Sequence, residues 1–311
     1  METERSRDAP GAEAAPTSIS VLLAVHNGER DLSYQLAALG PQCGGDVEIV
    51  MVDDGSSDSS PDIIAEFAKR HPLTLISHPK PMGKAYCLNM AASTAQGEFL
   101  ITLDQDDIIG DAYIERMGTE LRRYPFVAAR LEYDKLNPRW LADALRNAPN
   151  QDLANITLYG QKASEEGSGI RRVPVANGCA LGIRRSVLTQ LDGFAADVGV
   201  ADDLDLCLRA EFAGIPYRRA ETAVLHYRLR ATARGLLSQR YGYGVSWAAL
   251  YRKYRSAGMR RPGLRRTVRE VLSSLRGVIS ASRMTRASGT ARLGFTLGRI
   301  GGSVKYRAYY I

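Results

Sequence analysis

The sequence predicts an α/β protein in which helices flank a mainly parallel sheet, followed by a basic helical extension. Short apolar runs alternate with helical stretches over residues 19–131, at the spacing of strand–helix–strand units, which favours parallel pairing. Several of the apolar runs end in acidic residues. Charge is also divided along the chain. Residues 251–311 hold fifteen basic residues and one acid, whereas residues 1–250 hold 26 basic and 33 acidic residues.

Five apolar runs in the first part of the chain predict strands, because each has the length of a buried strand and is bounded by turn residues. A helix is expected after each of the first four, and the second of these helices has Pro61 in its first turn, where proline is tolerated. The strands are expected at 19–25, 47–52, 73–77, 98–103 and 126–131, and the helices at 29–39, 58–70, 84–95 and 111–123.

The pattern loosens over residues 134–172, a polar stretch with several Asn, Pro and Gly that is too long for an ordinary connection. Such a stretch is typical of a functional insertion. Regular structure is then expected as a strand at 174–183, helices at 184–190 and 202–213, and a strand at 221–226.

The extension is expected to be helical, because apolar residues recur with a period of 3.6 over 264–279 and again over 293–304. Gly294, Gly298 and Gly301 lie beside the second apolar stripe, and this row of small residues predicts close packing against another helix.

These features predict a flexible leader over residues 1–17, one α/β domain over 18–230 and the extension over 231–311. No apolar run approaches the roughly 20 residues that cross a bilayer, and the leader lacks the apolar core of a signal peptide. The four cysteines show no metal-binding or disulfide spacing, so reduced thiols in a cytoplasmic protein are expected.

Three acidic clusters follow predicted strands or open predicted helices: VDDGS (52–56), LDQDD (103–107) and ADDLDL (201–206). Open α/β sheets bind ligands at the carboxyl ends of their strands, so the clusters are expected to face one crevice. Carboxylates there suit Mg²⁺ or Mn²⁺ together with substrate phosphates. The alternative interpretation is that these acids cap the helices that follow.

Longer stretches strengthen the metal-and-diphosphate interpretation. They are SVLLAVHNGER (20–30), VDDGSSD (52–58), GKAYCLNMAASTAQGEFLITLDQDD (83–107), NGCALGIRRSVLTQLDGF (177–194), ADDLDLCLRAEFAG (201–214) and AVLHYR (223–228). Together they resemble the GT-A fold inverting glycosyltransferases of family 2, over roughly residues 19–230. The downstream part resembles a subset of bacterial members with a basic helical tail.

The resemblance implies a nucleotide-binding half at about 18–110 and an acceptor half at about 111–230. It implies that Mn²⁺ or Mg²⁺ is bound by Asp106 directly, with Asp104 holding the ribose and metal-bound water, and that His226 contacts the metal or diphosphate from the far side. His26 stands where the family usually has an aromatic residue against the base. The donor-binding residues implied are Ala24, His26, Asn27, Glu29, Asp53, Asp54, Lys84, Asp104 and Gly178.

The family pattern Glu-Asp-x-Asp-Leu corresponds here to residues 202–206, with Asp202 in place of Glu. The resemblance makes Asp203 the base that takes the proton from the acceptor hydroxyl, beside Asp202. The alternative is that Asp202 caps the following helix. Trp140 and Phe194 are candidate acceptor contacts, although core packing explains either equally well.

The function expected is metal-dependent, inverting transfer of a sugar from a nucleotide-diphosphate-sugar to a hydroxyl of a polysaccharide, glycolipid or secondary metabolite. A sugar nucleotidyltransferase is an alternative, but VHNGER (25–30) lacks a Gly- and Arg-rich phosphate loop. An inactive nucleotide-sugar-binding module is a third hypothesis, disfavoured by the intact acidic clusters.

Three roles compete for the basic extension. An anionic membrane surface, reached by a peripheral protein at the inner face of the plasma membrane, is favoured by basic amphipathic helices. Packing on the α/β domain or on a second copy in a homodimer is the second role. Nucleic acid is disfavoured, because no nucleic-acid-binding motif accompanies the charge.

Overall fold

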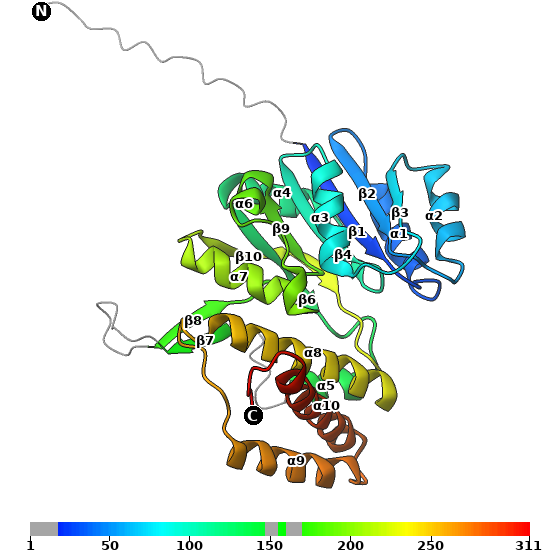
Figure 1. Cartoon of the computed structure of the whole chain (residues 1–311). Helices are drawn as coiled ribbons and strands as arrows, with labels where there is room; N and C mark the ends of the chain where they lie inside the picture. The colour runs from blue at the N-terminus through cyan, green and yellow to red at the C-terminus, as the bar shows by residue number, and fades with distance from the viewer. Residues whose placement is uncertain (1–17, 147–154, 160–169) are drawn as a thin grey trace, which may run out of the picture.

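The computed structural model describes residues 18–146, 155–159 and 170–311. At its centre is an eight-stranded sheet in the order β3-β2-β1-β4-β9-β6-β10-β5 (Figure 1). A separate hairpin joins β7 and β8. The strands are β1 (Ile19–Val25), β2 (Val47–Asp53), β3 (Thr74–Ser77), β4 (Phe99–Asp104), β5 (Ile108–Ile109), β6 (Phe126–Glu132), β7 (Asn155–Tyr159), β8 (Ile170–Pro174), β9 (Leu181–Arg184) and β10 (Tyr217–His226).

The sheet is parallel where the sequence alternates most regularly. β3, β2, β1 and β4 are parallel neighbours, and β6 is parallel to β10. β9 runs antiparallel between β4 and β6, and β5 pairs antiparallel with β10 at the edge. The predicted α/β fold class is confirmed, and the sheet is mixed only in that β9 and β5 run against the other strands.

Helices cover both faces of the sheet. α1 (Leu32–Leu39), α2 (Ser60–Ala68) and α4 (Tyr113–Arg123) contribute to one core, and α3 (Lys84–Thr94), α6 (Arg185–Gln190) and α7 (Asp202–Phe212) to the other. Successive strand residues point to opposite faces, so Leu22 of β1 enters one core and its neighbours Val21 and Leu23 the other.

The single strand expected at 174–183 is wrong. β8 ends at Pro174 and β9 begins at Leu181, with a loop between them. This loop is apolar because it is buried: Ala176 and Ala180 are fully covered, and the Thr102 hydroxyl donates a hydrogen bond of 2.7 Å to the carbonyl of Gly178. Within the polar stretch 134–172, the described residues form regular elements, namely α5 (Arg139–Arg146), β7 and the start of β8.

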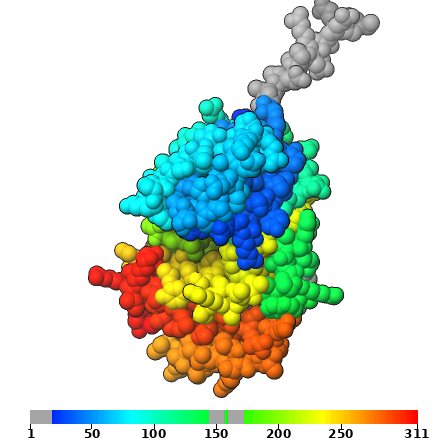
Figure 2. All heavy atoms as spheres, turned by 90° about the vertical axis from the view of Figure 1, so that its right-hand side faces the viewer, coloured from blue at the N-terminus to red at the C-terminus, as the bar shows by residue number. Residues whose placement is uncertain are grey.

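The extension consists of α8 (Ala233–Tyr254), α9 (Leu264–Val278) and α10 (Arg283–Lys305). Figure 2 shows it, yellow to red, as a lower lobe beneath the blue and cyan N-terminal half of the sheet. α8 lies within the extension that was expected to be helical, although its own bounds were not predicted. The close packing predicted for the glycines of 293–304 is confirmed, because a Cβ on Gly298 would lie 2.1 Å from the carbonyl oxygen of Tyr241 in α8.

α8 is fixed to the α/β domain through one buried carboxylate. Asp205 of α7 is fully buried, and it accepts a hydrogen bond of 2.8 Å from the Tyr254 hydroxyl. It also pairs with Lys253 at 2.6 Å and with Arg209 at 2.6 Å. The last turn of α8 therefore packs on the helix that begins with Asp202 and Asp203.

α9 has its apolar side outward. Thr267, Ser274 and Gly277 are its buried residues, and Gly277 touches Gly289 of α10. Glu270 faces the same way and pairs with the buried Arg299. The exposed apolar residues form one stripe: Leu264 (60 % exposed), Val268 (49 %), Leu272 (54 %), Leu275 (47 %) and Ile279 (84 %).

None of the helices in the described ranges combines the length and hydropathy that crossing a bilayer requires.

Candidate active site

The predicted donor residues meet at the carboxyl ends of three parallel strands. Val25 of β1 pairs with Asp53 of β2, and Ala24 of β1 pairs with Asp104 of β4, so the ends of these strands are level. His26 and Asp54 follow directly. This is the edge at which open α/β sheets bind ligands.

The Asp54 carboxylate shapes the loop around it. It accepts hydrogen bonds from the amides of Met82 at 2.6 Å and Gly83 at 2.9 Å. Burial acts to raise the pKa of Asp54, but these two amides and smaller contributions lower it overall. The carboxylate is therefore ionised at neutral pH and bridges the end of β2 to the start of α3.

His26 is held on two sides. Its Nδ1 lies 2.8 Å from the carbonyl oxygen of Asp54. Its backbone amide donates to Gln105 Oε1 at 2.8 Å, and its carbonyl accepts from Gln105 Nε2 at 2.9 Å. The sequence interpretation did not single out Gln105, although it lies inside LDQDD. Its amide joins this acidic cluster to the first strand.

Asn27, Glu29 and Asp53 hold the loop 55–59. The amide of Ser57 donates to Asn27 Oδ1 at 2.8 Å, and the hydroxyl of Ser59 donates to Glu29 Oε2 at 3.0 Å. The amide of Ser56 donates to Asp53 Oδ1 at 3.1 Å. These three side chains stabilise the loop after β2 through contacts within the chain.

Lys84 joins the donor side to the second acidic cluster. It lies at the first residue of α3 and forms an ion pair with Asp104. Burial acts to lower the pKa of Lys84, but the carboxylates of Asp104 and Asp202 raise it overall. A Cβ on Gly178 would lie 3.5 Å from Lys84 Nζ and 3.3 Å from Asp203 Cβ, so all three residues meet closely.

Asp202 and Asp203 begin α7 inside this group. Asp203 accepts hydrogen bonds from the amides of Gly178 at 2.9 Å and Leu204 at 2.7 Å. Asp202 is buried, and its Oδ2 has no hydrogen-bond partner among the residues that the structure describes. Burial and the charge of Asp203 raise the pKa of Asp202, and burial also raises that of Asp203. The cap position of α7 is Ala201, so the interpretation of Asp202 as a helix cap is wrong.

Possible ligands for a metal ion lie around Asp104, the partner of Lys84. One ligand atom each of Asp104, Asp107 and Cys179 lies within 4.8 Å of the others. Asp107 is almost fully buried, and within the described ranges its Oδ2 has no hydrogen-bond partner. Burial raises the pKa of the Cys179 thiol far above its usual value, and a protonated thiol is a poor ligand for a hard cation. The donor set therefore fits Mg²⁺ or Mn²⁺ on the carboxylates.

Two arginines in the segment after β10 contact Asp106 and Asp107, and neither was predicted from the sequence as a site residue. Arg230 Nη2 lies 2.7 Å from Asp106 Oδ2. Arg228 donates to the carbonyl of Asp106 and, through its own amide, to Asp107 Oδ1, both at 2.8 Å. Burial and the charge of Asp104 raise the pKa of Asp106, and Arg230 opposes this rise.

The remaining predicted residues make their described contacts with groups other than the proposed metal and base carboxylates. His226 Nδ1 is 2.7 Å from Glu132 Oε2, and its Nε2 is 3.3 Å from Lys135 Nζ. Phe194 is buried in the core, with its amide bonded to Asn89. Trp140 is half-buried in α5, which packs against α10. Their assigned roles remain predictions.

The model of the family described as "Glycosyl transferase family 2" matches residues 20–191. The chain is similar to EpsH of Bacillus subtilis, with 37 % identity over 100 residues, 32 % of this chain and 29 % of that one. It is also similar to the poly-beta-1,6-N-acetyl-D-glucosamine synthase of Staphylococcus epidermidis, with 32 % identity over 111 residues, 36 % of this chain and 27 % of that one. The matched segment spans less than a third of either relative.

Solved structures show the same fold. The mannosyltransferase PcManGT from Pyrobaculum calidifontis, in complex with GDP-Man and Mn²⁺, has a TM-score of 0.65 at 18 % identity, covering 96 % of this chain and 90 % of that one. The S. aureus protein TarS 1–349, in complex with UDP-GlcNAc, has a TM-score of 0.52 at 14 % identity, covering 94 % and 93 %. At these identities the likeness concerns the GT-A fold alone.

Proposed function

Because this chain belongs to glycosyl transferase family 2, we propose that it transfers a sugar from a nucleotide-diphosphate-sugar to a hydroxyl of an acceptor, with inversion at the sugar carbon. One observation carries the proposal. The carboxylate pair Asp202–Asp203 is held beside Lys84 and Gly178, where the ends of the donor strands meet α7. Two acids near a fixed cation supply the base and the charge balance that the transfer needs.

The nucleotide would enter at the ends of β1 and β2. His26 offers an imidazole face at the position that receives the base, and Asp54 stabilises the loop that begins α3. The N-terminal end of α3 carries Lys84, whose ammonium is a point charge suited to a diphosphate. A helix N-terminus also favours negative charge, so α3 contributes in the same direction.

Asp104 and Asp106, supported by Asp107, would hold Mg²⁺ or Mn²⁺. When bound, the ion neutralises charge on the departing diphosphate. Asp107 contributes through its buried carboxylate, whose pKa is raised well above the usual value by burial and by the charges of Asp104 and Asp106. Arg230 and Arg228 hold these acids in place from the segment after β10.

Asp203 would take the proton from the acceptor hydroxyl as this attacks the sugar. The amide of Gly178 fixes one carboxylate oxygen at 2.9 Å, which orients the group toward the loop before β9. Asp202 raises the proton affinity of the pair through its like charge, and a base with a raised pKa removes a proton more effectively.

A binding screen tests the donor part directly. UDP, GDP and dTDP are each added with and without Mn²⁺, and the melting temperature is recorded. A ligand that binds only the folded state raises the midpoint by mass action. At least one nucleotide is expected to raise it only when Mn²⁺ is present. If none does, the chain lacks the proposed donor site.

We also propose that α9 binds an anionic membrane surface. Its five exposed apolar residues face away from α10 while Thr267 and Ser274 are buried, the reverse of a helix that packs for stability alone. Exposed arginines flank the stripe, and residues 251–311 carry only one acid. A charged lipid surface complements both features.

A further inference from the structure

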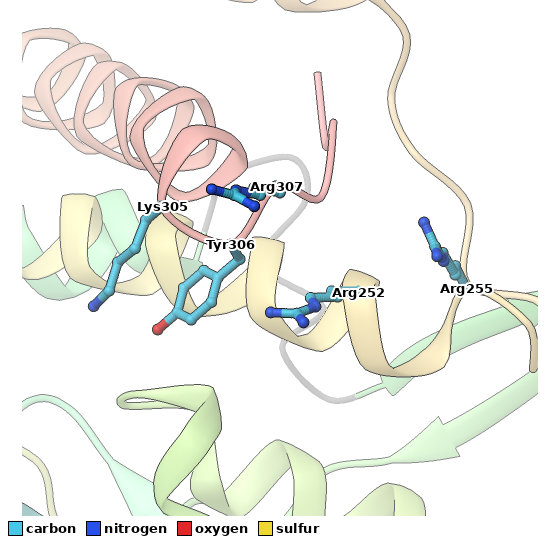
Figure 3. A pocket seen from close by; sticks show the side chains of 5 residues that line it. All are labelled: Arg252, Arg255, Lys305, Tyr306 and Arg307. Atoms are coloured by element: carbon cyan, nitrogen blue, oxygen red, sulfur yellow. The ribbon is translucent and has the colours of Figure 1, made fainter.

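A cavity of about 480 Å³ lies between the ends of α8 and α10. It is lined by Arg252, Arg255, Lys305, Tyr306 and Arg307. Figure 3 shows Arg252, Lys305 and Arg307 arranged around the Tyr306 ring, with Arg255 further along. No residue of the donor site described above contributes to it.

The positive charge of this cavity is not balanced by ion pairs with other described residues. All four cationic side chains are exposed, and none makes an ion pair within the described part of the chain. Lys253, their neighbour in sequence, is instead paired with Asp205. Cations near a helix C-terminus interact favourably with the helix dipole, which accounts for Arg252 and Lys305 in last turns. It does not account for Arg307, which lies beyond α10.

Arg307 also occupies an unfavourable backbone conformation. Its φ is +49°, and the amide of the next residue, Ala308, returns to the carbonyl of Ser303 at 3.0 Å. Helices that end in this way usually place glycine at such a position, because a residue with a side chain is strained there. The arginine has no ion-pair partner among the described residues to offset this strain. Strain of this kind is typical of binding sites.

The cavity adjoins the loop that leads to the proposed base. A Cβ on Gly199 would lie 4.0 Å from the Tyr306 hydroxyl, and the amide of Val200 is bonded to Ser246 of α8 at 3.0 Å. Asp203 is the fourth residue after Gly199, and at about 3.5 Å per residue the two are at most about 14 Å apart.

From these observations we infer that the cavity binds a phosphate group carried by the acceptor. Tetrahedral phosphate accepts hydrogen bonds from several cationic side chains at once, which suits Arg252, Lys305 and Arg307 around one tyrosine, with Arg255 further along. The position on the acceptor side of Asp203 separates this phosphate from the donor diphosphate at Lys84. Assignment to the acceptor rests on the proposed function, whereas the phosphate site itself does not.

The experiment measures binding of inorganic pyrophosphate to the full chain by calorimetry in EDTA, which disfavours the metal-dependent donor site. The double variant Arg252→Gln/Arg307→Gly is expected to bind at least tenfold more weakly. The control Arg276→Gln/Arg283→Gln removes the same charge from exposed positions elsewhere in the extension and should bind like the parent. Arg307→Gly alone should melt at or above the parent temperature, because glycine accepts a positive φ.

Equal binding by the double variant and the parent, or an equal loss in the control, would overturn the phosphate site. Affinity for a nucleoside diphosphate with Mn²⁺ should be the same in the double variant and the parent, and a parallel loss would overturn its assignment to the acceptor. If no form binds nucleotide, the donor proposal fails while the pyrophosphate result stands. Glycerol 3-phosphate and phosphatidate vesicles then distinguish a soluble acceptor from a lipid-borne one.

Discussion

Arg230 and Asp106 form an ion pair at the edge of the candidate active site, with 2.7 Å between Nη2 and Oδ2. Asp106 is the carboxylate expected to bind the metal directly. The guanidinium and the proposed metal ion therefore neutralise the same charge. Without metal, Arg230 limits repulsion among Asp104, Asp106 and Asp107.

This pairing predicts how Arg230→Gln alters the response to metal. In EDTA the variant should melt about 2–4 °C below the parent, the shift expected for about 1 kcal/mol in a protein of this size. Saturating Mn²⁺ should remove most of the difference, because the ion neutralises the exposed carboxylates. Arg234→Gln, an exposed arginine at the start of α8, is the control and should show no such dependence. A deficit of equal size with and without Mn²⁺ would argue against a metal site here.

The second prediction separates the base from its neighbour. Asp203→Asn should lower turnover by about 10² to 10⁴, the scale of a lost general base. Melting temperature and nucleotide affinity should stay close to those of the parent, because the donor contacts come from other residues. Asp197→Asn, on an exposed turn nearby, is the matched control. Normal turnover by Asp203→Asn would transfer the role to Asp202.

The third prediction concerns pH. The raised pKa values of Asp202 and Asp203 mean that the base is protonated in mildly acidic solution, so kcat/KM should rise with pH until both acids are ionised. Asp202→Asn removes the like charge and should move this rise to lower pH. An unchanged acidic limb in that variant would show that the two carboxylates are not coupled.

Stability should respond to pH in the opposite direction. Between the unfolded pKa of about 4 and the raised folded value, the folded chain holds a proton that the unfolded chain has lost. The contribution of Asp202 to the free energy of unfolding is therefore largest at low pH and declines as pH rises through this window. Chemical denaturation at several pH values should show a shallower decline for Asp202→Asn.

The fourth prediction tests the membrane role of α9. Leu264→Ser/Leu272→Ser should weaken sedimentation with anionic vesicles severalfold without lowering the melting temperature, because both side chains are more than half exposed. Binding of the parent should fall at high salt, where surface charge is screened. Leu75→Ser, an exposed apolar residue on β3, is the control. Equal binding to neutral and anionic vesicles would count against the proposal.

The fifth prediction addresses the packing of α8 on α10. Gly298→Ala should destabilise the protein by about 1–3 kcal/mol, because its Cβ would overlap the backbone of Tyr241. Gly242→Ala, also within this helix pair, has no atom within 4 Å of the added Cβ. It should stabilise by up to about 1 kcal/mol through helix propensity. A similar effect of both substitutions on the denaturation midpoint would contradict the close packing described.

The sequence predicted the first four parallel strands well because each is short, apolar and bounded by turn residues, so local pattern and tertiary position agree. The single strand predicted for 174–183 was wrong, because the central residues of this stretch are apolar through burial in a loop and not through pairing in a sheet. The bounds of α8 were not predicted within the helical extension, since this helix packs on both α7 and α10 and its apolar residues are spread around it. For the loop within 174–183 and for α8, contacts with distant parts of the chain determined the structure, and a local sequence pattern does not show these contacts.

In the candidate site, too, some residues could be predicted from local motifs and others only from the fold. Asp104, Lys84 and Asp203 belong to recognisable motifs, and the structure brings them together with Gly178. Arg230 belongs to no such motif and reaches Asp106 only because β10 ends beside β5. Cys179 lies in an apolar run, and its closeness to Asp107 depends on the turn before β9. Such pairs arise from chain topology, which one sequence does not reveal.

Asp205 has a consequence for protein engineering. A chain cut after residue 230 would lose Tyr254 and Lys253, leaving Arg209 as the remaining partner of a fully buried carboxylate. Removing partners from a buried charge costs several kcal/mol, and the affected helix begins with the proposed base. A chimera that exchanges the extension for that of another protein must therefore carry over both residues, whatever lipid or acceptor the new extension is chosen to bind.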